Sequence, residues 1–166
     1  MGLMTELPLN RGSISVRICA ELAPEWKSPV EELLFFNPRQ ALVEKQILAS
    51  IHAFGLPRVV LQGQTLRVVV GESMVVGTLF ALVNQGDEEQ LAGLLLFLRR
   101  EAELVCLHLS IDEPFAMRGA HADLKVAACL LDELRHIGLR IVGVEHLAIY
   151  YQRNGWYKLP LSTKLL

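Results

Sequence analysis

The sequence predicts an α/β domain of the α+β type, in which helices flank both faces of a mixed, mostly antiparallel central sheet. Residues 104–111 alternate between two sets of side chains, which is the period of a strand. The apolar runs at 66–70, 74–83 and 91–99 are separated by short polar segments, which is typical of an antiparallel meander. Helix signals precede and follow this group, and its strands are hydrophobic enough to be covered on both faces.

Length and composition indicate one domain, residues 1–166, with residues 1–12 expected to form a flexible N-terminus. Hydrophobic residues make up 52% of the chain and charged residues 20%, which indicates a globular protein with a large core. A net charge of −2 argues against nucleic acid as a partner. The mean hydropathy of +0.35 also suits a homodimer that buries an additional face, although it does not specify one.

Cysteine usage and the lengths of the apolar runs indicate where the protein works. Cys19, Cys106 and Cys129 are widely spaced in apolar surroundings, so we expect free thiols in a reducing compartment. No zinc-ligand spacing occurs, so no metal site is predicted. The apolar runs are too short to span a membrane, and the N-terminus lacks the pattern of a signal peptide. These features together predict a cytoplasmic enzyme or binding domain that does not contact a membrane.

One strand and two helices are predicted before the meander. Residues 13–19 alternate weakly and form the first strand. Ser28-Pro29 resembles a helix cap followed by a first-turn proline, and it opens a short helix that ends at about Phe36. Asn37-Pro38 repeats this pattern of a cap followed by a proline and opens a longer helix, which ends at Gly55.

The stretch from residue 103 to residue 134 is the centre of the predicted fold. Simple alternation along its strand places Cys106, His108, Ser110 and Asp112 on one face. His108 is the histidine set within an apolar strand, and the ordinary pKa of about 6.5 for histidine suits a base at neutral pH. A hydrogen-bonded core histidine is the alternative interpretation.

A loop and a long helix follow this strand. Pro114 ends the strand, because proline has no N–H to donate to the sheet. The small residues Gly119, Ala120 and Ala122 then let the backbone turn tightly into the helix. Amides at a helix start have no partners within the helix and can hold an anion. Close packing of a helix start is the alternative reason for the small residues.

The rest of the chain is predicted to add a parallel strand, a short helix and a final strand. Gly138 acts as the stop of the long helix, and residues 139–144 then form a strand parallel to the strand at 104–111. Residues 145–153 are predicted to be a short helix. Residues 156–161 resemble a last strand, interrupted by Pro160.

This order of elements, together with the segment Ile149-Tyr150-Tyr151-Gln152-Arg153-Asn154-Gly155-Trp156, resembles the GNAT superfamily of acyl-CoA-dependent N-acyltransferases. The resemblance covers residues 66–161 and implies a GNAT-like fold. The family's aromatic-Tyr-(three residues)-Gly-aromatic pattern places its tyrosine on Tyr151. The resemblance implies that Tyr151 protonates the departing thiolate as general acid. The alternative is that these aromatic side chains only pack the last helix on the sheet.

The loop after Pro114 carries the second part of the resemblance. The three positions of the family's pyrophosphate-binding pattern fall on Met117, Ala120 and Ala122, of which two are still small. A register that starts at Arg118 would place His121 at a position that should be small, so the first register is preferred. The residues that the resemblance assigns to the cofactor are Ile111, Asp112, Glu113, Met117, Arg118, Gly119, Ala120, His121 and Ala122. The pantetheine arm is expected at residues 111–113, where the parallel strands separate.

The resemblance implies transfer of an acetyl group from acetyl-CoA, or another acyl group from its CoA thioester, to an amine of a small molecule or peptide by direct attack. Such a reaction needs a base for the attacking nitrogen and an acid for the thiolate. His108 and Glu113 are candidate bases, with Asp112 as a further alternative, and Tyr151 is the candidate acid. Two other functions stay open: a degenerate GNAT-fold binding or interaction module without activity, and a sensor of another small ligand.

Overall fold

A computed structural model describes residues 13–37, 44–72, 74–151 and 155–161. The predicted flexible N-terminus lies outside the described residues, as do most of the predicted Asn37-Pro38 cap and residues 152–154. The helices are α1 (Lys27–Phe35), α2 (Glu44–Phe54) and α3 (Val126–Arg140), with 3₁₀ turns at Pro24–Trp26, Glu113–Phe115 and Ala122–Leu124. The strands are β1 (Ser15–Cys19), β2 (Pro57–Gln62), β3 (Thr65–Val70), β4 (Met74–Val75), β5 (Gly77–Gln85), β6 (Glu88–Arg100), β7 (Glu103–Ile111), β8 (His146–Tyr151) and β9 (Gly155–Pro160).

The strands form a six-stranded sheet in the order β1-β5-β6-β7-β8-β9 and a separate small sheet in the order β2-β3-β4. Every pair in the large sheet is antiparallel except β7 and β8, which are parallel because α3 connects them. The structure therefore confirms the predicted α+β class with a mixed, mostly antiparallel sheet. The predicted meander is wrong at its start, because the strand at 66–70 is β3 of the small sheet and the strand at 74–83 is divided into β4 and β5, which pair in different sheets.

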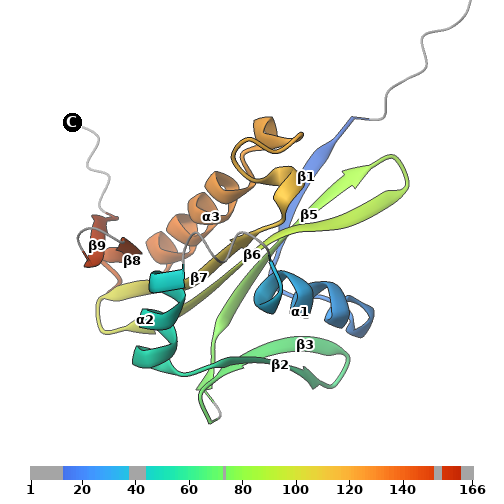
Figure 1. The fold of residues 1–166 in the computed structure, drawn as a ribbon. Helices are drawn as coiled ribbons and strands as arrows, with labels where there is room; N and C mark the ends of the chain where they lie inside the picture. Colours follow the sequence, from blue (N-terminus) through green and yellow to red (C-terminus); the bar gives the residue numbers. More distant parts are fainter. Residues whose placement is uncertain (1–12, 38–43, 73, 152–154, 162–166) are drawn as a thin grey trace, which may run out of the picture.

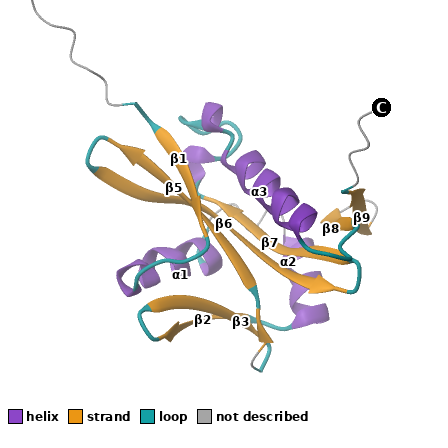
Figure 2. Cartoon of the chain, turned by 180° about the vertical axis from the view of Figure 1, so that it is seen from behind, coloured by secondary structure: helices purple, strands orange, loops and turns teal. Residues whose placement is uncertain are grey.

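Helices cover both faces of the large sheet. Helix α3 lies along one face, while α1 and α2 lie on the other, and the β2–β3 hairpin covers the outer side of α1 (Figures 1 and 2). The core is accordingly divided by the sheet. Leu130 and Leu134 of α3 are fully buried in one cluster, and Val30 of α1 and Val68 of β3 are fully buried in the other. No helix in the described part of the chain is long and apolar enough to cross a membrane.

The C-terminal elements differ from the prediction. Helix α3 continues past Gly138 to Arg140, and a Cβ at Gly138 would lie 2.6 Å from Leu161 Cδ1. Gly138 thus permits close packing inside the helix instead of ending it. Residues 146–151, predicted as a helix, form the parallel strand that was expected at 139–144. A short apolar run is ambiguous between helix and strand, and pairing with β7 on one side and β9 on the other decides it.

Two smaller predictions are also corrected. The polar segment 84–90 is not a loop, because β5 and β6 extend through it to a tight turn in which Gly86 has a φ of +64°. Helix α1 begins at Lys27 after a 3₁₀ turn, and its N-cap position is Trp26, so Ser28 is not the cap. Gly55 does end α2, with a φ of +101° and its N–H bonded to the carbonyl of Ile51.

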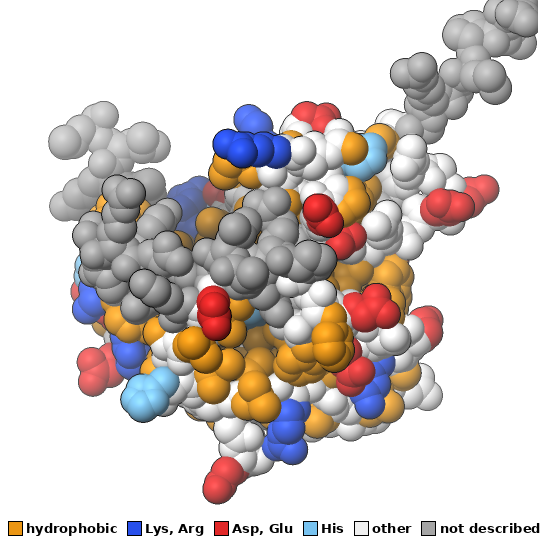
Figure 3. Space-filling view, in the orientation of Figure 1, with side chains coloured by type: hydrophobic (Ala, Val, Ile, Leu, Met, Phe, Trp, Pro, Cys, Tyr) orange, Lys and Arg blue, Asp and Glu red, His pale blue; other side chains and the backbone are white. Residues whose placement is uncertain are grey.

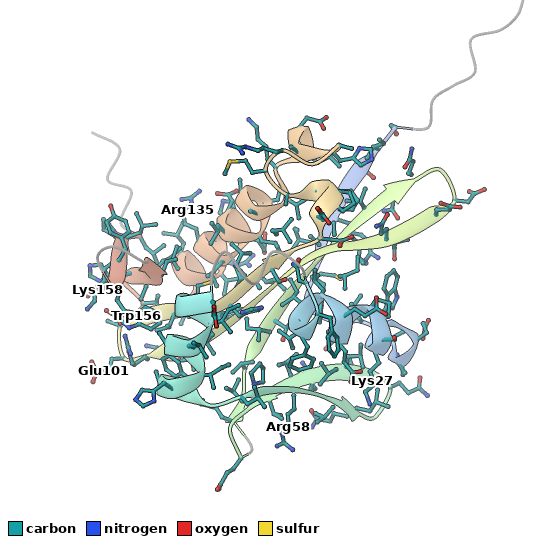
Figure 4. The ribbon with its side chains drawn as sticks, viewed as in Figure 1. Lys27, Arg58, Glu101, Arg135, Trp156 and Lys158 are labelled. Carbon is teal, nitrogen blue, oxygen red and sulfur yellow. The ribbon has the colours of Figure 1, made fainter. Side chains whose placement is uncertain are left out.

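The C-terminal hairpin is joined to α2 and to β7 through its strand β9, which carries Trp156 and Lys158 (Figure 4). The ring of Trp156 packs edge-on against Phe54 of α2 at 6.1 Å between centroids, and Arg100 lies over its face at 5.6 Å. Lys158 and Arg100 both pair with the buried carboxylate of Glu103. The hydrogen bond from Lys158 is the main cause that lowers the pKa of Glu103.

Removing buried volume under α3 should destabilise the protein. We expect Leu130→Ala to lower the free energy of unfolding by about 2–5 kcal/mol, because Leu130 is fully buried against the sheet. Leu139 lies on the same helix and is 45% exposed, so Leu139→Ala should change the free energy of unfolding by only about 0.5 kcal/mol. Urea denaturation followed by circular dichroism measures both variants, and equal losses would contradict the packing described here.

Candidate functional site

A β-bulge in β7 determines which side chains face each helix layer. Leu96 pairs with His108 and Phe97 pairs with Cys106, so Leu107 is an extra residue without a partner on β6. One extra residue reverses the alternation of side chains beyond it. The predicted common face is therefore wrong for Cys106, which lies in the core cluster under α3, and burial raises the pKa of its thiol to about 12. His108 and Ser110, in contrast, face α1 and α2.

A buried hydrogen-bond network holds the end of β7 against α1. The hydroxyl of Ser110 donates to the carbonyl of Leu33 at 2.7 Å. Nδ2 of Asn37 donates to that hydroxyl at 2.7 Å and to the carbonyl of Ile111 at 2.9 Å. Asn37 and Ser110 are 8% and 4% exposed, so these bonds lie away from water and are costly to break. The helix start that Asn37 was predicted to cap lies outside the described residues, and the described bonds of Asn37 connect α1 to β7.

The large sheet opens beside the second half of β7. The parallel pairs between β7 and β8 run from Glu103–His146 to Cys106–Ile149. From Leu107 onward, no described residue of β8 pairs with β7, because the bulge bends the strand and interrupts the ladder. The separation of the parallel strands was predicted at residues 111–113, and it begins four residues earlier, at the bulge.

A cavity of about 420 Å³ lies at this opening, and we call it the α3 cavity. Its walls are the end of β7, the loop that follows and the first turn of α3. The lining residues are Asn37, His108, Leu109, Ser110, Ile111, Phe115, Ala116, Met117, Ala122, Lys125, Val126, Ala127 and Ala128. Most of these side chains are apolar or small, so the cavity offers backbone groups and the start of a helix to a ligand.

The helix start lies later in the chain than predicted. Helix α3 begins at Val126, after Lys125 with a φ of +51°, and the small residues before it belong to the loop. Gly119 is needed by the loop itself, because a Cβ there would lie 2.4 Å from the carbonyl oxygens of Glu113 and Pro114. The amides of the first turn, at residues 126–128, are therefore the ones that adjoin the cavity.

Only three of the nine predicted cofactor residues line the α3 cavity: Ile111, Met117 and Ala122. Those that do not line it are Asp112, Glu113, Arg118, Gly119, Ala120 and His121. Asp112 accepts a hydrogen bond from Gln90 at 3.3 Å, and Glu113 is exposed in a 3₁₀ turn. His121 stacks on Phe115 with 5.5 Å between the ring centroids. Arg118, Gly119, Ala120 and His121 were counted from Pro114, and the two 3₁₀ turns displace that count from the helix start. Asp112 and Glu113 were predicted beside the pantetheine arm, at a strand separation that in fact begins earlier, at the bulge.

The prediction missed Val126, Ala127 and Ala128, which form the first turn of the true helix start. A signal for them exists in the sequence, since Val126, Leu130 and Leu134 recur every four residues and are all fully buried. Asn37 has no comparable signal, because its partners are far away in the chain.

His108 is the most unusual side chain of the site. Its Nε2 atom is buried and has no hydrogen-bond partner among the described residues. Burial lowers its pKa to about 4, so the imidazole is neutral at pH 7 and is a weaker base than the ordinary pKa implies. A buried polar atom without a partner costs about 1–3 kcal/mol. A ligand group that bonds to Nε2 would recover this cost.

Tyr151 is the last residue of β8, where it pairs with Gly155 of β9. Its predicted position at the end of a helix is therefore wrong. The side chain of Tyr151 lies outside the described residues, so its role as an acid stays a prediction. In the register of the sheet, Tyr151 is two residues beyond Ile149, the last residue of β8 that pairs with β7.

No protein-family model, curated protein or solved structure matches the chain significantly. The site is thus interpreted from its own geometry. The start of α3 can hold an anion, the free side of β7 can pair with an extended ligand that carries amide groups, and the apolar walls can exclude water. His108 adds one neutral, buried group that can accept or donate a hydrogen bond.

The lowered pKa of His108 should make folding depend on pH. The unfolded chain binds a proton at a pKa of about 6.5, whereas the folded state binds it only near 4, so the free energy of unfolding should fall as the pH drops from about 6.5 to about 4. The loss should reach roughly 3 kcal/mol. Urea titrations at a series of pH values measure it, and His108→Gln, which cannot titrate, should show a flatter profile. Identical profiles for the two proteins would contradict the burial of a neutral His108.

Proposed function

We propose that this protein is an acyl-CoA-dependent N-acyltransferase of the GNAT type, which transfers an acyl group, acetyl in the simplest case, to an amine of a small molecule or peptide. The observation that carries the proposal is the opening of the sheet at the bulge in β7, directly beside the first turn of α3. An anion site and an unpaired strand edge thus border one cavity, which is the combination that a long ligand with a diphosphate and two amides requires.

The residues around the α3 cavity fit coenzyme A. The amides of residues 126–128 would hold the diphosphate, with Lys125 adding positive charge beside them. The backbone of β7 from Leu107 to Ile111 would pair with the pantetheine amides in place of a further strand. Leu109, Phe115 and Ala116 provide the apolar walls. When bound, the cofactor would supply the acyl group as an activated thioester.

His108 would orient the attacking amine. Because the imidazole is neutral and its Nε2 is otherwise without a partner, it can accept a hydrogen bond from the nitrogen at the time of attack. A pKa near 4 holds a full proton poorly, so the proton would pass on to water. Tyr151 would donate the proton that the thiolate needs on leaving. Glu113 has less support as a base, since it is exposed and does not line the cavity.

A binding module without activity is the second candidate function. The observation that favours it is the lining of the α3 cavity, which contains no carboxylate among the described residues and therefore offers His108 as its one candidate base. Such a module would bind CoA or its thioesters without consuming them. Calorimetry together with a thiol-release assay on candidate amines separates the two functions.

A negative charge at the start of α3 should weaken the binding of CoA. Ala127→Asp places a carboxylate where the diphosphate would lie, and we expect at least a ten-fold loss of affinity by isothermal titration calorimetry. The same charge is favourable at a helix N-terminus, so the thermal midpoint of unfolding should not fall. Ala127→Ser is the matched neutral control and should bind within about three-fold of the unmodified protein. Equal affinities for all three proteins would remove the diphosphate from this site.

Tyr151→Phe should lower kcat more than it raises KM, because it removes only the hydroxyl that would protonate the thiolate. A decrease in kcat of about 10²-fold or more is expected of a general acid. Tyr157→Phe in the neighbouring strand β9 is the control and should leave kcat unchanged. Steady-state release of CoA, followed with a thiol reagent, gives both constants. An unchanged kcat in Tyr151→Phe would exclude this role.

A further inference from the structure

A second hollow lies on the other side of His108, and we call it the apolar pocket. It measures about 190 Å³ and lies between α1, α2 and strand β3. Its lining residues are Leu34, Phe35, Ile47, Ile51, Gly55, Leu56, Pro57, Val70, Leu96, Leu107 and His108. Figure 3 shows hydrophobic side chains gathered on this face, where the surface is hollowed between α1 and α2.

His108 lies between the two hollows, because it lines both the α3 cavity and the apolar pocket. The bulge at Leu107 explains why His108 borders the apolar pocket. Leu107 and His108 are consecutive residues that both border the apolar pocket, which regular alternation would forbid. A ligand that enters along the free side of β7 would therefore meet the pocket at the point where β7 bends.

The chemistry of the pocket favours an alkyl chain over an amine. Ten of its eleven lining residues are apolar or glycine, and none of these described residues is a carboxylate. An ammonium group would lose its hydration there without gaining an opposite charge, which is costly, whereas an alkyl chain gains free energy on leaving water. An apolar cavity of about 150 Å³ can stay dry and bind benzene, so a pocket of this size has room for about six carbon atoms.

We propose that the apolar pocket binds the hydrocarbon tail of the acyl donor, and that the preferred donor carries an acyl chain of about six to eight carbons instead of acetyl. This inference rests on the proposed function, since it places the thioester beside His108. It keeps the acceptor amine out of the apolar pocket, on the side of His108 that borders the α3 cavity.

The test is a calorimetric series with CoA, acetyl-CoA, hexanoyl-CoA and octanoyl-CoA on the unmodified protein. Each methylene that the pocket removes from water should raise the affinity by up to about four-fold. We therefore expect octanoyl-CoA to bind at least ten-fold more tightly than acetyl-CoA. Because this series needs no variant, its outcome does not depend on how a substitution folds.

A matched pair of variants on α2 then locates the chain. Ile47 lines the apolar pocket, and its neighbour Leu48 is 56% exposed and does not line it. Ile47→Trp should fill the pocket and lower the affinity for octanoyl-CoA at least ten-fold, while the affinity for acetyl-CoA stays within about two-fold. Leu48→Trp should leave both affinities unchanged.

Three results would overturn the inference, and they separate it from the proposed function. If affinity stays flat from acetyl-CoA to octanoyl-CoA, the pocket does not hold the acyl chain, while the proposed function stands. If octanoate alone binds as tightly as octanoyl-CoA, the pocket serves a free fatty acid and not a thioester donor. If neither CoA nor any of its thioesters binds, the proposed function fails and this inference fails with it.

Discussion

The extra residue Leu107 in β7 is the constraint on which the rest of the site depends. It reverses the alternation of side chains, so that Val105 and Leu107 pack toward α1 before the bulge and Ser110 does so after it. The same irregularity bends the strand and ends its pairing with β8. A single inserted residue thereby opens the sheet, turns His108 toward α1 and α2, and places it between the α3 cavity and the apolar pocket.

An opened sheet needs other contacts to hold its helices, and the structure supplies them at both ends of β7. At the carboxyl end, the hydrogen bonds among Asn37, Ser110 and the carbonyl of Leu33 fix α1. At the amino end, the packing of Trp156 on Phe54 fixes α2. The walls of the apolar pocket are thus held before any ligand arrives, which lowers the ordering cost of binding.

The polarity of the site is divided along the path of the proposed ligand. The start of α3 presents backbone amides and Lys125 to an anion, whereas the far side of His108 presents alkyl and aromatic groups. His108 lies at the boundary, and the burial that lowers its pKa also keeps it neutral at pH 7. An acyl-CoA molecule has the same division, because its diphosphate lies far from its acyl chain.

The sequence by itself determined the elements whose signals are local. Period-two alternation located β1 and β7, glycine located the end of α2, and the closely spaced strands predicted the antiparallel meander of β5, β6 and β7 but not the separation of β3 into another sheet. Tertiary structure decided the rest. Residues 146–151 became a strand because β7 and β9 pair with them, and Gly138 lies within α3 where Leu161 leaves no room for a side chain. The bulge at Leu107 has no local signature, since it is an offset between two strands, and so the surroundings of His108 were decided only when β6 and β7 paired.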